Sequence, residues 1–205
     1  MQRPLFLLLI LLFSCKQNNN EDKTKLDLSQ KDTGTKLVWR KEVFDPKLKA
    51  NLSKIVLNEQ YFQNISEPEK AAIGYVATFV GSECDWDEKV NKNFTNLNCK
   101  VISALGLGYQ CSDTHLNFLK RWFRDDPKVL SELKDCSVIP FTATEQNTFD
   151  SLNITEKEDT IKILYEASGV NLNEGKNWNW SEEVLFRISN DKLILVNKSK
   201  VSKDI

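Results

Sequence analysis

The chain contains one histidine, His115, which lies four residues after Cys111. Residues four apart lie on one face of a helix, so these two side chains could form a nucleophilic pair of thiolate and imidazole. The alternative is that Cys111 is oxidised to a disulfide and His115 occupies the first turn of its helix. We favour the second interpretation, because the amino terminus described below indicates export to an oxidising compartment.

A single histidine also limits metal chemistry. Zinc takes its ligands mainly from histidine and cysteine, and here several cysteines would have to take part. The serines show no nucleophile-elbow pattern. The sequence therefore predicts no metal site and no cofactor, identifies no catalytic residue, and favours a protein that is not an enzyme.

Four acidic residues, Glu83, Asp85, Asp87 and Glu88, lie close together in the chain. Carboxylate oxygens are the ligands that calcium prefers. An EF-hand loop needs glycine at its sixth position, however, and counting from Asp85 that position is Val90. We therefore interpret this run as a solvated loop beside the end of a helix.

Trp178 and Trp180 are the residues best suited to binding a partner. They alternate with Asn177 and Asn179, so in a strand both indoles point to the same side. Aromatic side chains flanked by amides can grip a sugar face or anchor a protein partner. The alternative, which the sequence favours, is that both indoles cover the sheet against a helical layer.

The first fifteen residues have the order of a secretory signal. Arg3 is followed by an apolar run at positions 5–13, then by Ser14 and Cys15. Nine apolar residues are too few to span a bilayer, which needs about 20. The run from Leu12 to Cys15 resembles the lipobox of bacterial lipoproteins, although Phe13 stands where a smaller residue is usual.

This resemblance implies that residues 1–14 are removed and that Cys15 becomes the lipidated first residue of the mature chain. It places the protein in the cell envelope, anchored by palmitate-type acyl chains to the outer membrane on its periplasmic or surface side. It carries no information about the domain that follows. The alternative is a plain signal peptide with an incidental cysteine.

If Cys15 carries the lipid, four cysteines remain, an even number in an oxidising compartment. Helix ends predicted near them favour two disulfides, Cys84 with Cys99 and Cys111 with Cys136. Each would close a short loop and stabilise the fold by about 3 kcal/mol in the chain-entropy model. The rival pair of Cys99 with Cys111 would have to bridge a helix end to end, roughly 18 Å.

The charge of the chain is nearly balanced, with a formal net charge of −1. Loss of Arg3 with the signal leaves 28 − 1 = 27 basic against 29 acidic residues. Composition therefore indicates neither nucleic acid nor an anionic membrane surface as the partner. Residues 15–36 comprise the lipidated cysteine and a polar segment with few apolar side chains, which predicts a disordered tether.

Residues 37–205 are predicted to form one domain, helical over 46–136 and mainly strands over 138–198. Asp45 and Pro46 resemble a helix start and predict a helix over 46–59. Ser66 and Glu69 stand in capping-box register before a second, nearly all-apolar helix. Helices are also expected after Cys99, after Ser112 and after Asp126.

Beyond Pro140 the apolar residues alternate, as in half-buried strands. This alternation covers residues 161–165 and 184–188, and the turn Asn190-Asp191 joins the second run to residues 193–196 as a hairpin. Helices first and strands second predict an α+β fold in which a helical amino-terminal half with two disulfides packs on a carboxyl-terminal antiparallel sheet.

These features predict an exported, lipid-anchored and non-catalytic binding protein of the envelope, resembling an inhibitor or immunity protein in its role. Its expected partners are the membrane, through Cys15, and a protein or glycan of the envelope. The alternative is an envelope hydrolase that uses carboxylates or the Cys111 and His115 pair.

Overall fold

A computed structural model describes residues 34–81, 84–86, 97–136 and 144–201, with only the backbone described for 84–86, 97–98 and 201. All of them belong to one compact unit, Asp32–Ile205. The predicted signal, Cys15 and nearly all of the predicted tether lie outside the described residues. The first strand begins at Thr35, two residues before the predicted start of the domain.

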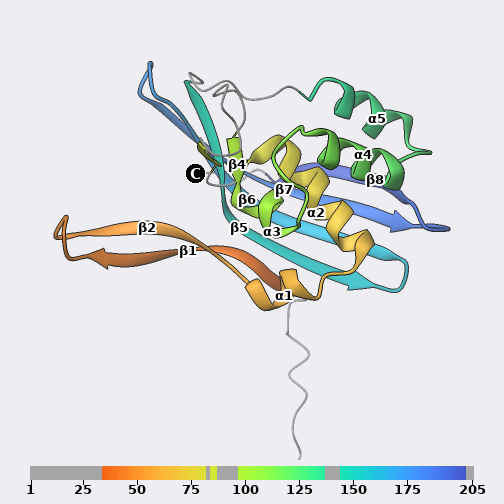
Figure 1. Ribbon diagram of the computed structural model, residues 1–205, viewed down its shortest axis with the longest axis horizontal. Coiled ribbons are helices and arrows are strands. Elements are labelled where there is room, and N and C mark those ends of the chain that lie inside the picture. Colours follow the sequence, from red (N-terminus) through yellow and green to blue (C-terminus); the bar gives the residue numbers. More distant parts are fainter. Residues whose placement is uncertain (1–33, 82–83, 87–96, 137–143, 202–205) are drawn as a thin grey trace, which may run out of the picture. The chain divides into compact units, whose positions relative to one another are not determined.

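Six strands form one antiparallel sheet in the order β2-β1-β5-β6-β7-β8 (Figure 1). They are β1 (Thr35–Asp45), β2 (Ala50–Leu57), β5 (Glu145–Lys157), β6 (Thr160–Asn171), β7 (Lys176–Ile188) and β8 (Leu193–Val201). Two short strands, β3 (Cys84–Trp86) and β4 (Leu97–Cys99), pair separately. The sheet therefore takes strands from both ends of the described chain.

The strands of the carboxyl-terminal region confirm the alternation seen in the sequence. Ile161, Ile163 and Tyr165 are buried on the inner face of β6. The predicted hairpin is also present, because Asn190 and Asp191 both have positive φ values, 49° and 57°, between β7 and β8. Two left-handed residues in succession give the tight turn that matches the twist of paired strands.

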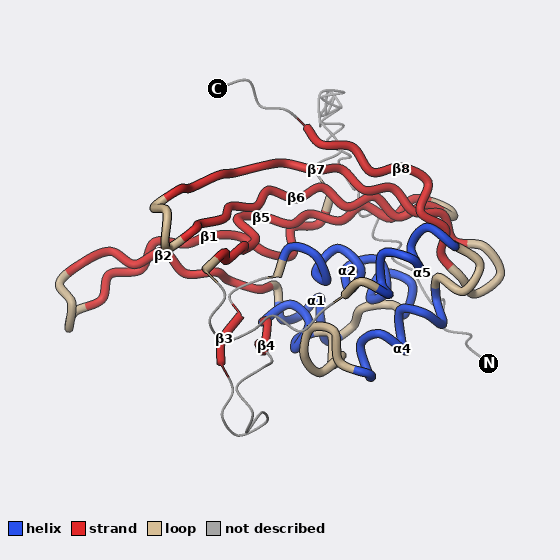
Figure 2. Tube along the Cα trace, turned by 90° about the horizontal axis from the view of Figure 1, so that it is seen from above, coloured by secondary structure: helices blue, strands red, loops and turns tan. Residues whose placement is uncertain are grey.

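The helices lie together on the inner face of the sheet (Figure 2). They are α1 (Glu59–Gln63), α2 (Glu67–Val80), α3 (Lys100–Ala104), α4 (Asp113–Trp122) and α5 (Pro127–Lys134). Helix α2 has the predicted capping box at Ser66 and Glu69. It contacts β5, β6 and β8 on one side and α3 and α4 on the other, so it is buried between two layers.

The core joins these layers through a cluster of aromatic rings. Tyr75 of α2 lies with its ring centre 5.4 Å from that of Phe123 and 5.7 Å from that of Phe186 of β7. Where α2 meets α4 and the loop before it, a β-carbon at Gly74 would lie 3.0 Å from the Leu107 side chain and 3.3 Å from that of Leu119. Glycine therefore lets the outer helices approach α2 closely.

Asp126 fastens the helical layer to the edge of the sheet. Its Oδ1 atom accepts a hydrogen bond from the Val129 N–H, which caps α5, and its Oδ2 atom accepts one from the Leu195 N–H of β8. Nearby, Arg124 donates to the backbone oxygens of Asn190 and Asp191 in the β7–β8 turn. The Asp126 carboxylate therefore accepts hydrogen bonds from both the helical layer and the sheet.

The predicted helical amino-terminal half is wrong. Residues 35–57 form the β1–β2 hairpin, and the helix expected over 46–59 is absent. Asp45 does cap a local structure, but its side chain accepts hydrogen bonds from the N–H groups of Lys47 and Leu48 in a tight turn. Lys49 then has a φ of 50°, which returns the chain as β2. An Asx turn and a helix start share these first bonds.

Only the first part of the β1–β2 hairpin is paired with the rest of the sheet. The last pair between β1 and β5 is Trp39 with Ser151, and from Arg40 onward β1 pairs with β2 alone. We call residues 40–55 the β1–β2 arm. Figure 1 shows this arm diverging from β5, β6 and β7.

The second correction concerns the disulfides, because the residues that the structure describes hold one disulfide where two were expected. Cys111 and Cys136 are bonded, with their Cα atoms 5.8 Å apart. Cys84 is the register partner of Cys99 in the β3–β4 pair, but the side chain of Cys84 lies outside the described residues. That pairing therefore stays a prediction.

Candidate functional site

The inner face of the sheet carries Trp178 where β5, β6 and β7 extend toward the β6–β7 turn. Trp178 is the register partner of Gly169 in β6, and Gly169 is that of Asn147 in β5. Because alternate residues of a strand share a face, Trp178 points to the same side as the buried Val184 and Phe186. Trp178 itself is half-buried.

Gly169 brings the indole and the amide together. A β-carbon at this position would overlap both the Trp178 ring and the Asn147 Oδ1 atom, so only glycine lets the indole lie across β6. Asn147 Oδ1 is covered yet has no hydrogen-bond partner among the described residues. A buried acceptor without a donor costs about 1–3 kcal/mol, and because this oxygen is covered, the part of the group that remains exposed is the Trp178 side chain.

Trp180 has a different environment, although it points to the same side as Trp178. It packs against the core cluster, and its Nε1 lies 3.5 Å from the hydroxyl oxygen of Tyr165, to which it donates. Tyr165 in turn donates to the buried carboxylate of Glu182. Burial raises the pKa of Tyr165, and the hydrogen bond to Glu182 raises it further. Trp180 is thus part of a structural chain of hydrogen bonds.

The structure therefore separates the two tryptophans that the sequence grouped. Trp180 takes the covering role, whereas Trp178 lies outside the set of side chains packed on the core. Sequence reasoning missed Asn147 and Gly169, because they belong to strands that only the register places beside Trp178. The sole signal was a glycine inside a strand pattern, which often marks a close approach.

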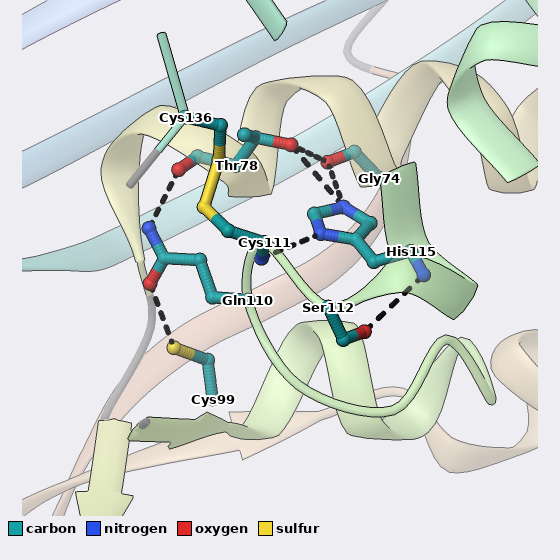
Figure 3. The surroundings of a disulfide bond; sticks show 8 residues. All are labelled: Gly74, Thr78, Cys99, Gln110, Cys111, Ser112, His115 and Cys136. Carbon is teal, nitrogen blue, oxygen red and sulfur yellow. Dashed lines mark hydrogen bonds between the residues drawn. A yellow bond between two sulfur atoms is a disulfide. The ribbon is translucent and has the colours of Figure 1, made fainter. Parts of the chain in front are cut away.

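His115 is fully buried and both its ring nitrogens are engaged (Figure 3). Nδ1 accepts the Cys111 N–H at 3.1 Å, which leaves the proton on Nε2. Nε2 lies 3.3 Å from the Gly74 carbonyl oxygen and 3.2 Å from Thr78 Oγ1. Burial lowers the pKa of His115, and the Gly74 carbonyl opposes this in part. The neutral ring therefore joins α4 to α2.

The Cys111 and His115 pair does not form a nucleophilic site in this structure. Cys111 Sγ is bonded to Cys136, and the contact between Cys111 and His115 is made by the backbone N–H. Beside them, Gln110 donates to the Thr78 carbonyl oxygen at 2.7 Å, and its Oε1 lies 3.4 Å from Cys99 Sγ. This cluster links four chain segments and has a structural role.

Of the four residues in the acidic run, the structure describes only Asp85. Glu83, Asp87 and Glu88 lie outside the described residues, and Asp85 is described only as a backbone position in β3. Among the residues that are described, no group of His, Cys, Asp and Glu side chains is arranged to hold a metal ion. In the same residues, no helix has the length and apolar character needed to span a bilayer.

Comparisons with protein-family models, with curated proteins and with solved structures found no significant match to this chain. The site is therefore argued from its own geometry.

We expect the Cys111–Cys136 disulfide to contribute substantially to stability. It closes a loop of 25 residues, for which the chain-entropy model gives roughly 3 kcal/mol. The double variant Cys111→Ser/Cys136→Ser should lower the free energy of unfolding by about that amount in urea titrations. Wild-type protein unfolded under reducing conditions is the control and should show at least this loss. A free thiol at Cys111 in the denatured, unreduced protein would contradict the assignment.

We also expect the buried His115 to make stability depend on pH. Its pKa is lowered in the folded state from an ordinary 6.5, so the unfolded chain binds the proton first as the pH falls. The free energy of unfolding should therefore decrease from about pH 7.5 to about pH 5.5. In His115→Gln this part of the decrease should vanish, although the variant is less stable at neutral pH. Parallel pH curves for the two proteins would count against the assignment.

Proposed function

We propose that this protein is an exported, lipid-anchored binding protein of the cell envelope whose partner is a protein or a glycan. The observation that carries the proposal is the group of Trp178, Gly169 and Asn147 on the inner face of the sheet. An indole held across a glycine, partly exposed and outside the set of side chains packed on the core, offers an apolar surface to a partner. Exposed aromatic side chains of this kind are features of binding sites.

Export is supported by two independent features. The first is the order of charged, apolar and small residues that ends at Cys15. The second is the Cys111–Cys136 disulfide, since such bonds persist in oxidising compartments and are rare in the cytosol. A lipid on Cys15 would hold the domain at the membrane, where a partner in the envelope is within reach.

The geometry gives no specific support to the alternative of an envelope hydrolase. Its named nucleophile, Cys111, is held in a disulfide, and His115 is buried with both nitrogens engaged. Glu69, Glu132 and Glu182, which are carboxylates near the core, each accept a hydrogen bond from a tyrosine. Binding is therefore the function that we develop.

Lipidation of Cys15 is directly testable in a bacterial host. The wild-type chain should incorporate labelled palmitate and fractionate with membranes, and Cys15→Ala should abolish the label. Cys111→Ser is the matched cysteine control and should keep the label, because its thiol is consumed in a disulfide. If Cys15→Ala retains the label, the lipobox assignment is wrong.

Binding through Trp178 is testable by capture of partners from envelope extracts on the immobilised mature chain. A stoichiometric partner captured by wild type should be lost with Trp178→Ala and retained with Asn147→Leu, because the Asn147 oxygen is covered. Since Asn147→Leu removes an unpartnered oxygen, its free energy of unfolding should be unchanged or higher. Capture that survives Trp178→Ala would contradict the proposed site.

The matched control is Trp39→Ala, which removes a half-buried indole from the opposite face of the sheet. Trp39 pairs with Ser151 on the outer face, so its loss should leave capture intact. Equal loss of capture in Trp39→Ala and Trp178→Ala would reject the inner face as the binding site.

A further inference from the structure

The β1–β2 arm ends in two large apolar side chains that face solvent. Phe44 is 61% exposed at the end of β1, and Leu48 is 65% exposed in the turn. The Asp45 carboxylate accepts the N–H groups of Lys47 and Leu48 at 2.8 and 3.1 Å, which fixes the turn. Both apolar groups are therefore held at the tip, where no core is available to them.

Lysines surround this tip. Lys47 and Lys49 flank Leu48 in the turn, and further along the arm Lys41 stands directly opposite Lys54 in the register. Like charges in that position weaken a strand pair. No ion pair joins these four ammonium groups to any carboxylate of the described chain, whereas Arg40 is paired with Asp150. The arm thus carries uncompensated positive charge.

Two acidic residues of the arm do not cancel this charge. Apart from Arg40, which is paired with Asp150 outside the arm, the four lysines stand against Glu42 and Asp45 alone. This gives a local net charge of 4 − 2 = +2 in a chain whose overall net charge is −1. The Asp45 carboxylate also points into its own turn. The structure gathers at one exposed place a positive charge that the overall composition conceals.

We infer that the β1–β2 arm is a membrane-contact element that places Phe44 and Leu48 among the headgroups of an anionic bilayer. Two side chains are too few for a stable protein interface, which buries about 800 Å² on each partner. Apolar groups flanked by lysines instead match the layered chemistry of a bilayer surface, with anionic headgroups above acyl chains. Charge complementarity therefore selects this partner.

The length of the chain is compatible with this contact in an anchored protein. Cys15 lies twenty positions before Thr35, a length of chain that spans at most about 70 Å when extended. The eleven residues of β1 extend over only about 35 Å. The tip can therefore reach the bilayer that holds the lipid, and the arm would then set the orientation of the domain.

The test uses the mature chain from residue 15 with Cys15→Ser, so that no lipid contributes, and flotation with vesicles of phosphatidylcholine alone or with about one third phosphatidylglycerol. We expect binding to the anionic vesicles that weakens as salt is raised, because screening shortens the reach of the lysine charges. Binding to neutral vesicles should be at least tenfold weaker. Equal partitioning into both vesicle types would overturn the inference.

Two variants separate the contributions of the tip. Lys47→Gln/Lys49→Gln should reduce partitioning into anionic vesicles about 30-fold, or about fivefold per lysine. Phe44→Ser/Leu48→Ser should reduce it at least tenfold through loss of apolar burial. All four side chains are exposed, so circular dichroism and thermal unfolding should match wild type. Unchanged partitioning in both variants would reject the arm as the contact element.

Leu172→Ser is the matched control. Leu172 is 60% exposed in the β6–β7 turn, much like Leu48, but Glu174 and Lys176 beside it form an ion pair, so no excess positive charge surrounds it. Its substitution should leave partitioning within about twofold of wild type. An equal loss in Leu172→Ser and in Phe44→Ser/Leu48→Ser would show nonspecific adsorption and reject the inference. Trp178→Ala should also bind vesicles normally, which keeps this test independent of the proposed partner site.

Discussion

The packing of α2 is the constraint on which the rest of the structure depends. Ten of its residues are buried, among them Ala71, Ile73, Tyr75 and Val80, so the helix needs apolar neighbours on nearly every side. The sheet supplies one side through β5, β6 and β8, and the outer helices supply the other. Gly74 allows the outer helical layer to approach α2 closely, and the ring contact between Tyr75 and Phe186 joins α2 to the sheet.

This arrangement explains why the chain inserts its helices between β2 and β5. Ile163 and Val184 are buried on the inner face of the sheet, which α2 contacts through β5, β6 and β8. Beyond that contact the strands extend past the helical layer. The β1–β2 arm and the Trp178 group both lie toward the end of the sheet where β5 begins and β6 ends, and they are therefore free to contact other molecules.

The Trp178 group and the β1–β2 arm differ in chemistry and lie at separate places on the sheet. We propose that Trp178 offers an indole face to a protein or glycan, and that the arm offers lysines around an apolar tip to a bilayer. A lipid on Cys15 would bring both surfaces to the envelope membrane. The Cys111–Cys136 disulfide and the buried His115 hold the helical layer in place, so the chemistry that looked catalytic in the sequence is structural.

The local features of the fold were accessible from sequence because they depend on residues near in the chain. A capping box at Ser66 or a two-residue turn at Asn190 is formed by hydrogen bonds within a few residues. The alternation in β6 and β7 likewise reports which side of a strand is buried. These predictions needed no knowledge of distant partners, and the structure confirms them.

The sequence by itself thus determined the helices after Ser66, Cys99, Ser112 and Asp126, the carboxyl-terminal strands and the Cys111–Cys136 pair. Only the tertiary structure decided that residues 35–57 are strands, because the first bonds of an Asx turn at Asp45 are the same as those of a helix start. It alone decided that Trp180 is structural and that Trp178 meets Asn147. Contacts between strands depend on register, and register is fixed by the whole sheet, not by the neighbours of a residue in the chain.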